Sequence, residues 1–125
     1  MKTFILLTGL FVLTASADQC GKKKVSSTRL KAKLETKAIC SNYTLRITEG
    51  EIDSSLVVAE WTDENTNKSY KKAFGLANPC DFPKDIAEGQ EFYFVIDTAK
   101  QKDCAVCMAY YPTPPKKLAI KVLRD

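Results

Sequence analysis

The segment Glu91-Phe92-Tyr93-Phe94-Val95-Ile96 decides the fold class, because it is the most apolar of several short stretches with alternating apolar side chains. A period of two is that of a β-strand, in which successive side chains point to opposite faces. Glu88-Gly89-Gln90 precedes the segment and has the residues of a turn. The sequence therefore predicts a strand here, with Phe92, Phe94 and Ile96 facing a core.

Alternation of the same kind recurs on both sides of this segment, at residues 29–40, 43–47, 55–62, 70–76, 106–110 and 118–122. Residues 29–40 are also rich in Leu, Ala, Lys and Glu, which favour helices, so a helix remains open there. Prolines in Asn78–Pro83 and Pro112–Pro115 exclude central strands from those stretches. The pattern predicts a mostly β fold, a small antiparallel barrel or sandwich of six to seven short strands stabilised by disulfides.

The first 17 of the 125 residues have the composition of a secretory signal peptide. Met1-Lys2-Thr3 supplies the positive start, Phe4–Thr14 the apolar run, and Ala15-Ser16-Ala17 a cleavage site of small residues. The apolar run is shorter than the roughly 20 residues of a membrane-spanning helix. We expect residues 1–17 to be removed and residues 18–125 to form a single β domain that is secreted and extracellular.

Five cysteines follow the predicted cleavage site: Cys20, Cys40, Cys80, Cys104 and Cys107. In an oxidising compartment each disulfide of so small a domain contributes about 2–4 kcal/mol. Because five is odd, at most two bridges form within the chain, and the leftover thiol could join two chains in a disulfide-linked dimer. The sequence alone does not choose among the possible pairings.

Cys104 and Cys107 also have the spacing of a dithiol redox motif. That chemistry requires the first cysteine at a helix N-terminus, where the pKa of its thiol is lowered. Here the motif runs into the alternating residues 106–110, and on a strand its two cysteines point to opposite faces. We therefore expect the two cysteines to bridge to different partners.

Two N-x-S/T sequons, Asn42-Tyr43-Thr44 and Asn67-Lys68-Ser69, are candidate N-glycosylation sites in an exported chain. Asn67 lies in the polar stretch 63–68, which is a predicted turn where a glycan would be solvated. Asn42 opens a predicted strand and is the weaker candidate.

Basic residues concentrate in residues 21–40, where seven stand against the single acid Glu35: Lys22, Lys23, Lys24, Arg29, Lys31, Lys33 and Lys37. Such a patch could bind an extracellular polyanion such as heparan sulfate or an acidic matrix surface. We favour the alternative of a solvated strand face whose lysines keep the protein soluble. Nucleic acid is disfavoured by export and by the lack of interleaved aromatic and basic residues.

The composition excludes several classes of catalyst. The chain has no histidine, which rules out Ser-His-Asp and Cys-His catalysis and zinc sites with imidazole ligands. It has no Gly-x-Ser-x-Gly motif and no phosphate-binding glycine loop. We therefore expect no enzymatic activity, no cofactor and no metal.

Three features resemble netrin-like modules: Cys20 near the mature start, Ile39-Cys40-Ser41 leading into a strand, and Cys80-Asp81-Phe82-Pro83 followed by Gly89–Phe94. The resemblance implies a secreted OB-type β-barrel, in a family that includes metalloproteinase inhibitors and the tails of matrix and complement proteins.

The sequence departs from those inhibitors at its mature start. They begin at a cysteine followed by a C-x-C pattern, whereas here Asp18-Gln19 precede Cys20 and Gly21-Lys22 follow it. Cleavage after Ala17 would leave no free cysteine amine to chelate a catalytic zinc.

These observations together predict a secreted, non-enzymatic binding protein that acts on an extracellular protein or a polyanionic matrix component. Three alternatives remain open at this point. They are a carrier of lipid or another small apolar ligand, a protease inhibitor of netrin-like type, and a CxxC thiol–disulfide protein.

Overall fold

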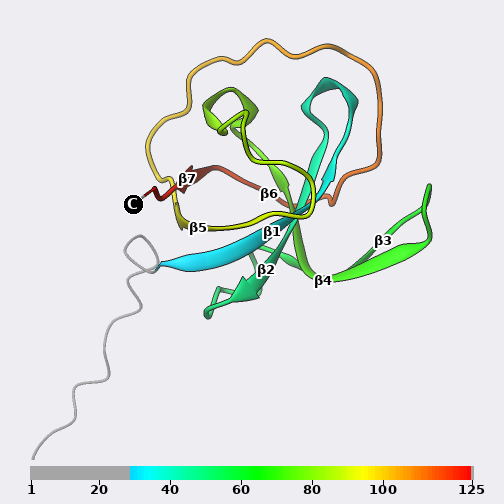
Figure 1. The fold of residues 1–125 in the computed structure, drawn as a ribbon, viewed down its shortest axis with the longest axis horizontal. Helices are drawn as coiled ribbons and strands as arrows, with labels where there is room; N and C mark the ends of the chain where they lie inside the picture. Colours follow the sequence, from blue (N-terminus) through cyan, green and yellow to red (C-terminus); the bar gives the residue numbers. More distant parts are fainter. Residues whose placement is uncertain (1–28, 125) are drawn as a thin grey trace, which may run out of the picture.

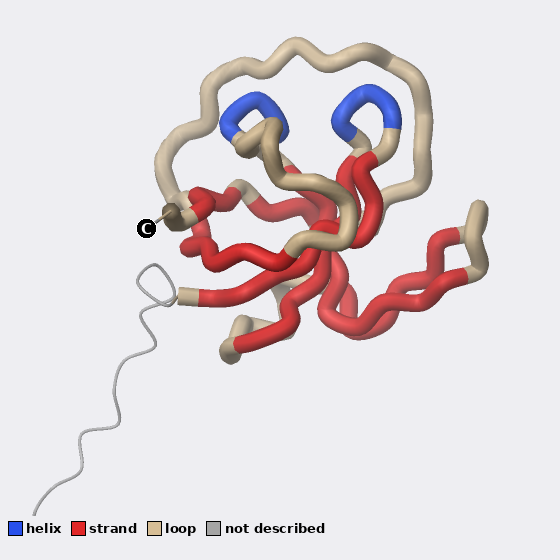
Figure 2. The backbone as a smooth tube through the Cα atoms, viewed as in Figure 1, coloured by secondary structure: helices blue, strands red, loops and turns tan. Residues whose placement is uncertain are grey.

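The computed structural model describes residues 29–124, which fold into one seven-stranded sheet and two short 3-10 turns (Figures 1 and 2). The strands are β1 Leu30–Lys37, β2 Tyr43–Glu49, β3 Val58–Asp63, β4 Lys68–Leu76, β5 Glu91–Ile96, β6 Lys117–Leu118 and β7 Ile120–Val122, and the turns are η2 Ile39–Ser41 and η3 Pro79–Asp81. This confirms the predicted mostly β fold. The expected signal peptide, Cys20 and the lysines Lys22, Lys23 and Lys24 lie outside the described residues.

Strand β1 is central, because it pairs antiparallel with β2 on one edge and with β5 on the other. Residues 30–37 are therefore a strand, which resolves the choice between strand and helix. Leu30, Ala32 and Leu34 are buried and the residues between them are half-buried, as the alternation predicts.

The sheet follows the order β3-β4-β2-β1-β5-β7, and β6 lies parallel to β4. Only Ala119 separates β6 from β7, so the segment 117–122 runs beside β4 and then beside β5. Gly75 N donates to Lys116 O at 2.8 Å on the β4 side, and Asp97 N donates to Ala119 O at 2.9 Å at the end of β5. This segment therefore bends the sheet round on itself.

The sheet does not close into the barrel that the sequence suggested. Ala73 pairs with Arg46 of β2 and with Val58 of β3, so β3 occupies most of the outer edge of β4. Only Gly75 and Leu76 remain for β6 on that edge. The period-two pattern predicts strands, but it does not specify how many residues each edge will pair.

The core lies on the concave side of this curled sheet. The rings of Phe74 and Phe94 are fully buried with their centroids 5.9 Å apart, and Phe92 is 5.5 Å from Phe82. The buried apolar side chains are Leu30, Ala32, Leu34, Leu45, Ile47, Val57, Ala73, Phe74, Leu76, Phe82, Ile86, Phe92, Phe94, Leu118 and Ile120. Burial of Phe92 and Phe94 confirms that the face predicted from the opening segment packs in the core.

The strand predicted at residues 106–110 is absent, and β3 begins at Val58 rather than at residue 55. Residues 100–114 contain no helix, turn or bend and pair with no described strand. Two disulfides tie this stretch to η2 and η3, and the prolines after it cannot donate to a sheet. The alternation correctly predicts an extended chain here, but not sheet pairing.

Asn78 holds the last strand in place. Its side chain is buried, Nδ2 donates to Ile120 O at 2.8 Å, and Ile120 N donates to Oδ1 at 2.9 Å. The amide therefore pairs with β7 as a neighbouring peptide group would. Its loss would leave two buried backbone groups without partners.

Replacing Asn78 with alanine should lower the free energy of unfolding by about 3 kcal/mol, from two lost hydrogen bonds and two unpaired backbone groups. Urea unfolding followed by tryptophan fluorescence measures this change. Ser54→Ala, at an exposed turn position, serves as the control and should change stability by less than about 0.5 kcal/mol. An Asn78→Ala protein as stable as this control would contradict the assigned role.

Candidate functional site

Residues 97–116 connect β5 to β6, and we call them the β5–β6 loop. Figure 1 shows this loop arching over the side of the molecule where η2 and η3 lie, and Figure 2 shows it passing both turns. Cys40 of η2 bonds to Cys107, and Cys80 of η3 bonds to Cys104. The loop is therefore bonded to η2, which follows β1, and to η3, which follows β4.

These two bridges confirm the prediction that Cys104 and Cys107 take different partners, and they leave no disulfide between the two. The Cα atoms lie 4.9 Å apart across Cys40–Cys107 and 5.8 Å apart across Cys80–Cys104. Their sequence separations of 67 and 24 residues correspond to about 4 and 3 kcal/mol of stabilisation by restriction of the unfolded chain. Cys20, outside the described residues, has no further cysteine in the chain to pair with.

Non-reducing peptide mapping of the purified, oxidised protein should yield two linked peptide pairs, one containing Cys40 and Cys107 and the other Cys80 and Cys104. Cys20 should be recovered in a separate peptide, either as a thiol or linked to a second chain. Recovery of Cys104 linked to Cys107 would contradict the structure and restore the dithiol interpretation.

The backbone at the first bridge is held in an uncommon conformation. Cys40 and Ser41 have φ angles of 59° and 61°, in the left-handed region that few residues other than glycine adopt. Each such residue costs about 1–3 kcal/mol and persists only where its surroundings enforce it. The bridge to Cys107 and the hydrogen bonds of Asn42 supply that enforcement.

Asn42 acts as a latch between η2 and the β5–β6 loop. Its Nδ2 donates to Ile39 O at 2.8 Å and to Ala109 O at 2.9 Å, so both amide protons are engaged. One side-chain amide therefore bridges the backbone carbonyls of Ile39 in η2 and Ala109 in the β5–β6 loop.

A second latch lies further along the loop, where Tyr111 OH donates to Asp63 Oδ2 at 3.2 Å. Desolvation and the neighbouring Asp63 carboxylate raise the pKa of Tyr111, which keeps its hydroxyl protonated as the donor. Asp63 is buried at the end of β3, so this contact joins the loop to the β3–β4 hairpin.

Exposed apolar side chains alternate along the loop with the residues that anchor it. Cys107, Ala109 and Tyr111 make the anchoring contacts just described, whereas the residues between them point away from the protein. Val106 is 44 % exposed, Met108 94 % and Tyr110 80 %, and we call these three the apolar triplet. With Ile39, which is 64 % exposed and belongs to the turn bonded to Cys107, they are the exposed large hydrophobic side chains of the described chain, and we call these four residues the exposed apolar surface.

The sequence indicated this surface only in part. The alternation of Val106, Met108 and Tyr110 predicts a strand at residues 106–110, and it does not indicate that these three side chains are exposed on a loop outside the sheet. The available signals that the stretch lies outside the sheet are its two closely spaced cysteines, each bonded to a different turn, and the prolines that follow it. Ile39 carried no signal of its own.

The two sequons occupy different environments. Asn67 lies exposed in the turn between β3 and β4 with a φ of 58°, a conformation that asparagine tolerates. Asn42 has both amide protons engaged, and a glycan would replace one of them. The hydroxyl of Thr44, the last residue of that sequon, is fully buried and has no hydrogen-bond partner.

We therefore expect a glycan on Asn67 and none on Asn42. Intact mass measured before and after enzymatic deglycosylation should show a glycan that Ser69→Ala abolishes and Thr44→Val leaves unchanged. Thr44→Val should also raise the free energy of unfolding by about 1 kcal/mol, because it removes a buried, unpaired hydroxyl at constant size. Loss of glycan mass in Thr44→Val alone would contradict the assignment.

The described members of the predicted basic patch are occupied by internal contacts. Lys31 Nζ lies 3.3 Å from Glu91, whose hydrogen bond raises the pKa of Lys31, and Lys33 Nζ lies 3.5 Å from Glu35. The guanidinium of Arg29 stacks 3.9 Å from the centre of the Tyr93 ring. These contacts leave few free cations on this face to meet a polyanion.

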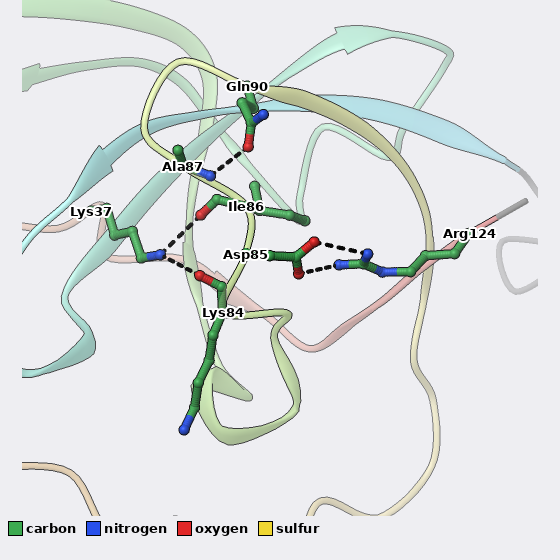
Figure 3. Close-up of polar contacts among 7 residues, drawn as sticks. All are labelled: Lys37, Lys84, Asp85, Ile86, Ala87, Gln90 and Arg124. Carbon is green, nitrogen blue, oxygen red and sulfur yellow. Dashed lines mark hydrogen bonds and ion pairs between the residues drawn. The ribbon is translucent and has the colours of Figure 1, made fainter.

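Lys37 binds the loop between η3 and β5 rather than solvent, as Figure 3 shows. Its Nζ donates to Lys84 O at 3.0 Å and to Ile86 O at 2.9 Å, and its backbone N donates to Glu88 at 3.0 Å. Lys37 is thus a structural residue at the end of β1.

The same loop is tied to the end of the chain, where Arg124 donates to both oxygens of Asp85 at 2.6 and 3.0 Å. These bonds hold the pKa of Asp85 below its usual range. The pair is intact above the ordinary pKa of an aspartate, and its contribution to stability is lost as pH falls through the lowered value. Both side chains are exposed, so the effect on stability is small.

The larger hollows described on this surface include two open depressions. One of about 400 Å³ is lined by Arg29, Lys31, Glu49, Gly50 and Tyr93. The other, of about 300 Å³, lies near the Asp85–Arg124 pair. Neither is the closed apolar cavity that a lipid carrier would need.

Within residues 29–124, no three His, Cys, Asp or Glu side chains gather as metal ligands would. The same part of the chain contains no helix long and apolar enough to cross a membrane. Comparison with protein families, curated protein sequences and solved structures finds no match to this chain. The exposed apolar surface on the β5–β6 loop is thus the feature that best indicates function.

Proposed function

We propose that this is a secreted, non-enzymatic binding protein that recognises an extracellular protein through the β5–β6 loop. The observation that carries the proposal is the apolar triplet, presented on a loop that two disulfides and two hydrogen-bonded latches hold in place. Exposed apolar groups gathered on one surface mark interaction sites in proteins.

The physical chemistry of the triplet suits a protein partner. Full burial of a side chain such as Met108 contributes about 1.5–3 kcal/mol, and aromatic residues and methionine are enriched in interfaces. Because the loop is already fixed, little conformational entropy is lost when it binds. The anchored loop can therefore bind a partner with appreciable affinity although the contact area is small.

A polyanionic partner is the weaker candidate. Lys31, Lys33 and Lys37 are engaged with carboxylates or backbone carbonyls, and a polyanion would have to displace those contacts. Free cations for a polyanion would have to come from elsewhere, such as Lys22, Lys23 and Lys24. We therefore place the binding surface on the loop rather than on β1.

Secretion is supported by the composition of residues 1–17 and by the two disulfides, which form and persist in oxidising compartments. Cys20, left without an intramolecular partner, supports the further proposal of a disulfide-linked dimer. Each chain of such a dimer would contribute one β5–β6 loop, so the dimer would present two binding loops.

The remaining alternatives have less support. A CxxC thiol–disulfide protein requires a reducible pair at Cys104 and Cys107, and those residues belong to separate bridges. A netrin-like inhibitor rests on the sequence resemblance alone, because the described sheet does not close into a barrel. Its zinc-chelating chemistry would depend on residues 18–22, which depart from the inhibitor pattern.

A photo-crosslinking experiment tests the proposal. A benzophenone amino acid placed at Ala105, beside the triplet, should yield a discrete protein adduct in extracellular fluid from the source organism. The same group at Ser54 should yield none. Excess unlabelled wild-type protein should suppress the adduct, whereas a Met108→Asp/Tyr110→Asp variant should not, because both substituted positions are exposed and the fold is retained.

An adduct suppressed equally by the wild-type protein and the double variant would overturn the proposal. So would a missing adduct together with retention on heparin that is lost when Lys22, Lys23 and Lys24 are neutralised. That result would transfer the binding surface to the basic segment.

A further inference from the structure

The β5–β6 loop presents its main chain as well as its side chains. Residues 98–115 make no backbone–backbone hydrogen bond within the described chain, and residues 100–114 run without helix, turn or bend. An extended segment whose amide N–H groups make no backbone–backbone hydrogen bond is suited to bind as an added β-strand, with alternate side chains entering pockets of the partner. The triplet supplies those alternate side chains.

Endopeptidases bind their substrates in this way, as extended strands whose main chain pairs with the edge of the cleft. Met108 is the most prominent side chain of the segment, at 94 % exposed, and it is unbranched at Cβ. It is therefore suited to a narrow apolar specificity pocket such as that of chymotrypsin. On either side of it, Cys107 and Ala109 place little bulk near the peptide bond to be attacked.

The anchors lie on both sides of the Met108–Ala109 peptide bond. Cys107 is bonded to Cys40, and Ala109 O accepts a hydrogen bond from Asn42 Nδ2 at 2.9 Å. Hydrolysis would add a hydroxyl group to the Met108 carbonyl carbon and a proton to the Ala109 nitrogen. Both new chain ends would remain held, so cleavage would release little conformational entropy. The new amino group of Ala109 would stay beside the Met108 carbonyl carbon, where it can attack that carbon, displace the added water and reform the peptide bond.

From this geometry we propose that the loop is a substrate-like inhibitor of a serine endopeptidase with an apolar specificity pocket, and that Met108 occupies that pocket. The inference rests on the proposed function, because it names the class of protein that the loop binds. It differs from metalloproteinase inhibition of the netrin-like kind, since it uses the loop and requires no free amine at the mature N-terminus.

Inhibition assays with the full secreted protein test this assignment, with chymotrypsin and trypsin as the probe enzymes. The wild-type protein should inhibit chymotrypsin competitively, with an inhibition constant below about 1 µM. Met108→Asp should weaken that inhibition by at least roughly 30-fold, as expected for a residue at the centre of an interface. Met108→Lys should lose inhibition of chymotrypsin and gain inhibition of trypsin, whose pocket is acidic.

Two further variants separate binding from resealing. Asn42→Ala should be cleaved between Met108 and Ala109 at least roughly tenfold faster than the wild-type protein, as measured by mass spectrometry, because Ala109 is no longer held. Ser54→Ala, in an exposed turn outside the loop, should match the wild-type protein in both assays.

The proposal is overturned if the wild-type protein does not inhibit chymotrypsin and Met108→Lys does not inhibit trypsin. It is also overturned if the Met108–Ala109 bond is cleaved rapidly and inhibition is then lost. Failure of these assays with a persistent crosslinked adduct at Ala105 would refute only the class of partner. Failure of both experiments would refute the binding role of the loop as well.

Discussion

The Cys40–Cys107 bridge is the constraint on which the candidate site depends. It joins a turn at the end of β1 to a loop 67 residues away, and the Asn42 latch reinforces it at Ala109. Between these two points the chain has no freedom to collapse onto the core, so Met108 must remain outside. The left-handed backbone at Cys40 and Ser41 is the conformational cost of placing the bridge there.

The open sheet makes that constraint possible. Because β4 leaves only a short edge for β6, the sheet curls without closing, and the turns η2 and η3 remain at its rim as anchor points. The side-chain amide of Asn78 holds β7 through hydrogen bonds to the backbone N and O of Ile120, as a neighbouring strand would. The loop is thus fixed by covalent and side-chain contacts, whereas the rest of the fold is fixed by backbone ladders and apolar burial.

Most of the fold followed from periodicity. The strands around Leu34 and Phe94 could be predicted because alternate side chains along each are buried in the core, which produces the period-two pattern in the sequence. The same alternation at residues 106–110 was misleading, since it records an extended chain and not which face meets the core. There Met108 is 94 % exposed, and Ala109 is held through its backbone carbonyl rather than by a buried side chain. The charge pattern does not identify a partner either, because a lysine such as Lys37 can bind two backbone carbonyls of its own chain instead of a polyanion.

The central claim is that residues 105–110 are rigid although they make no backbone–backbone hydrogen bond within the described chain, a combination that nitrogen-15 relaxation and amide hydrogen exchange by NMR measure together. Rigidity held by side chains and disulfides predicts order parameters near about 0.85, equal to those of the strands, with amide exchange as fast as in an unfolded chain. Order parameters below about 0.6 in this stretch would contradict the account, because a mobile loop could not present the apolar triplet in a fixed arrangement.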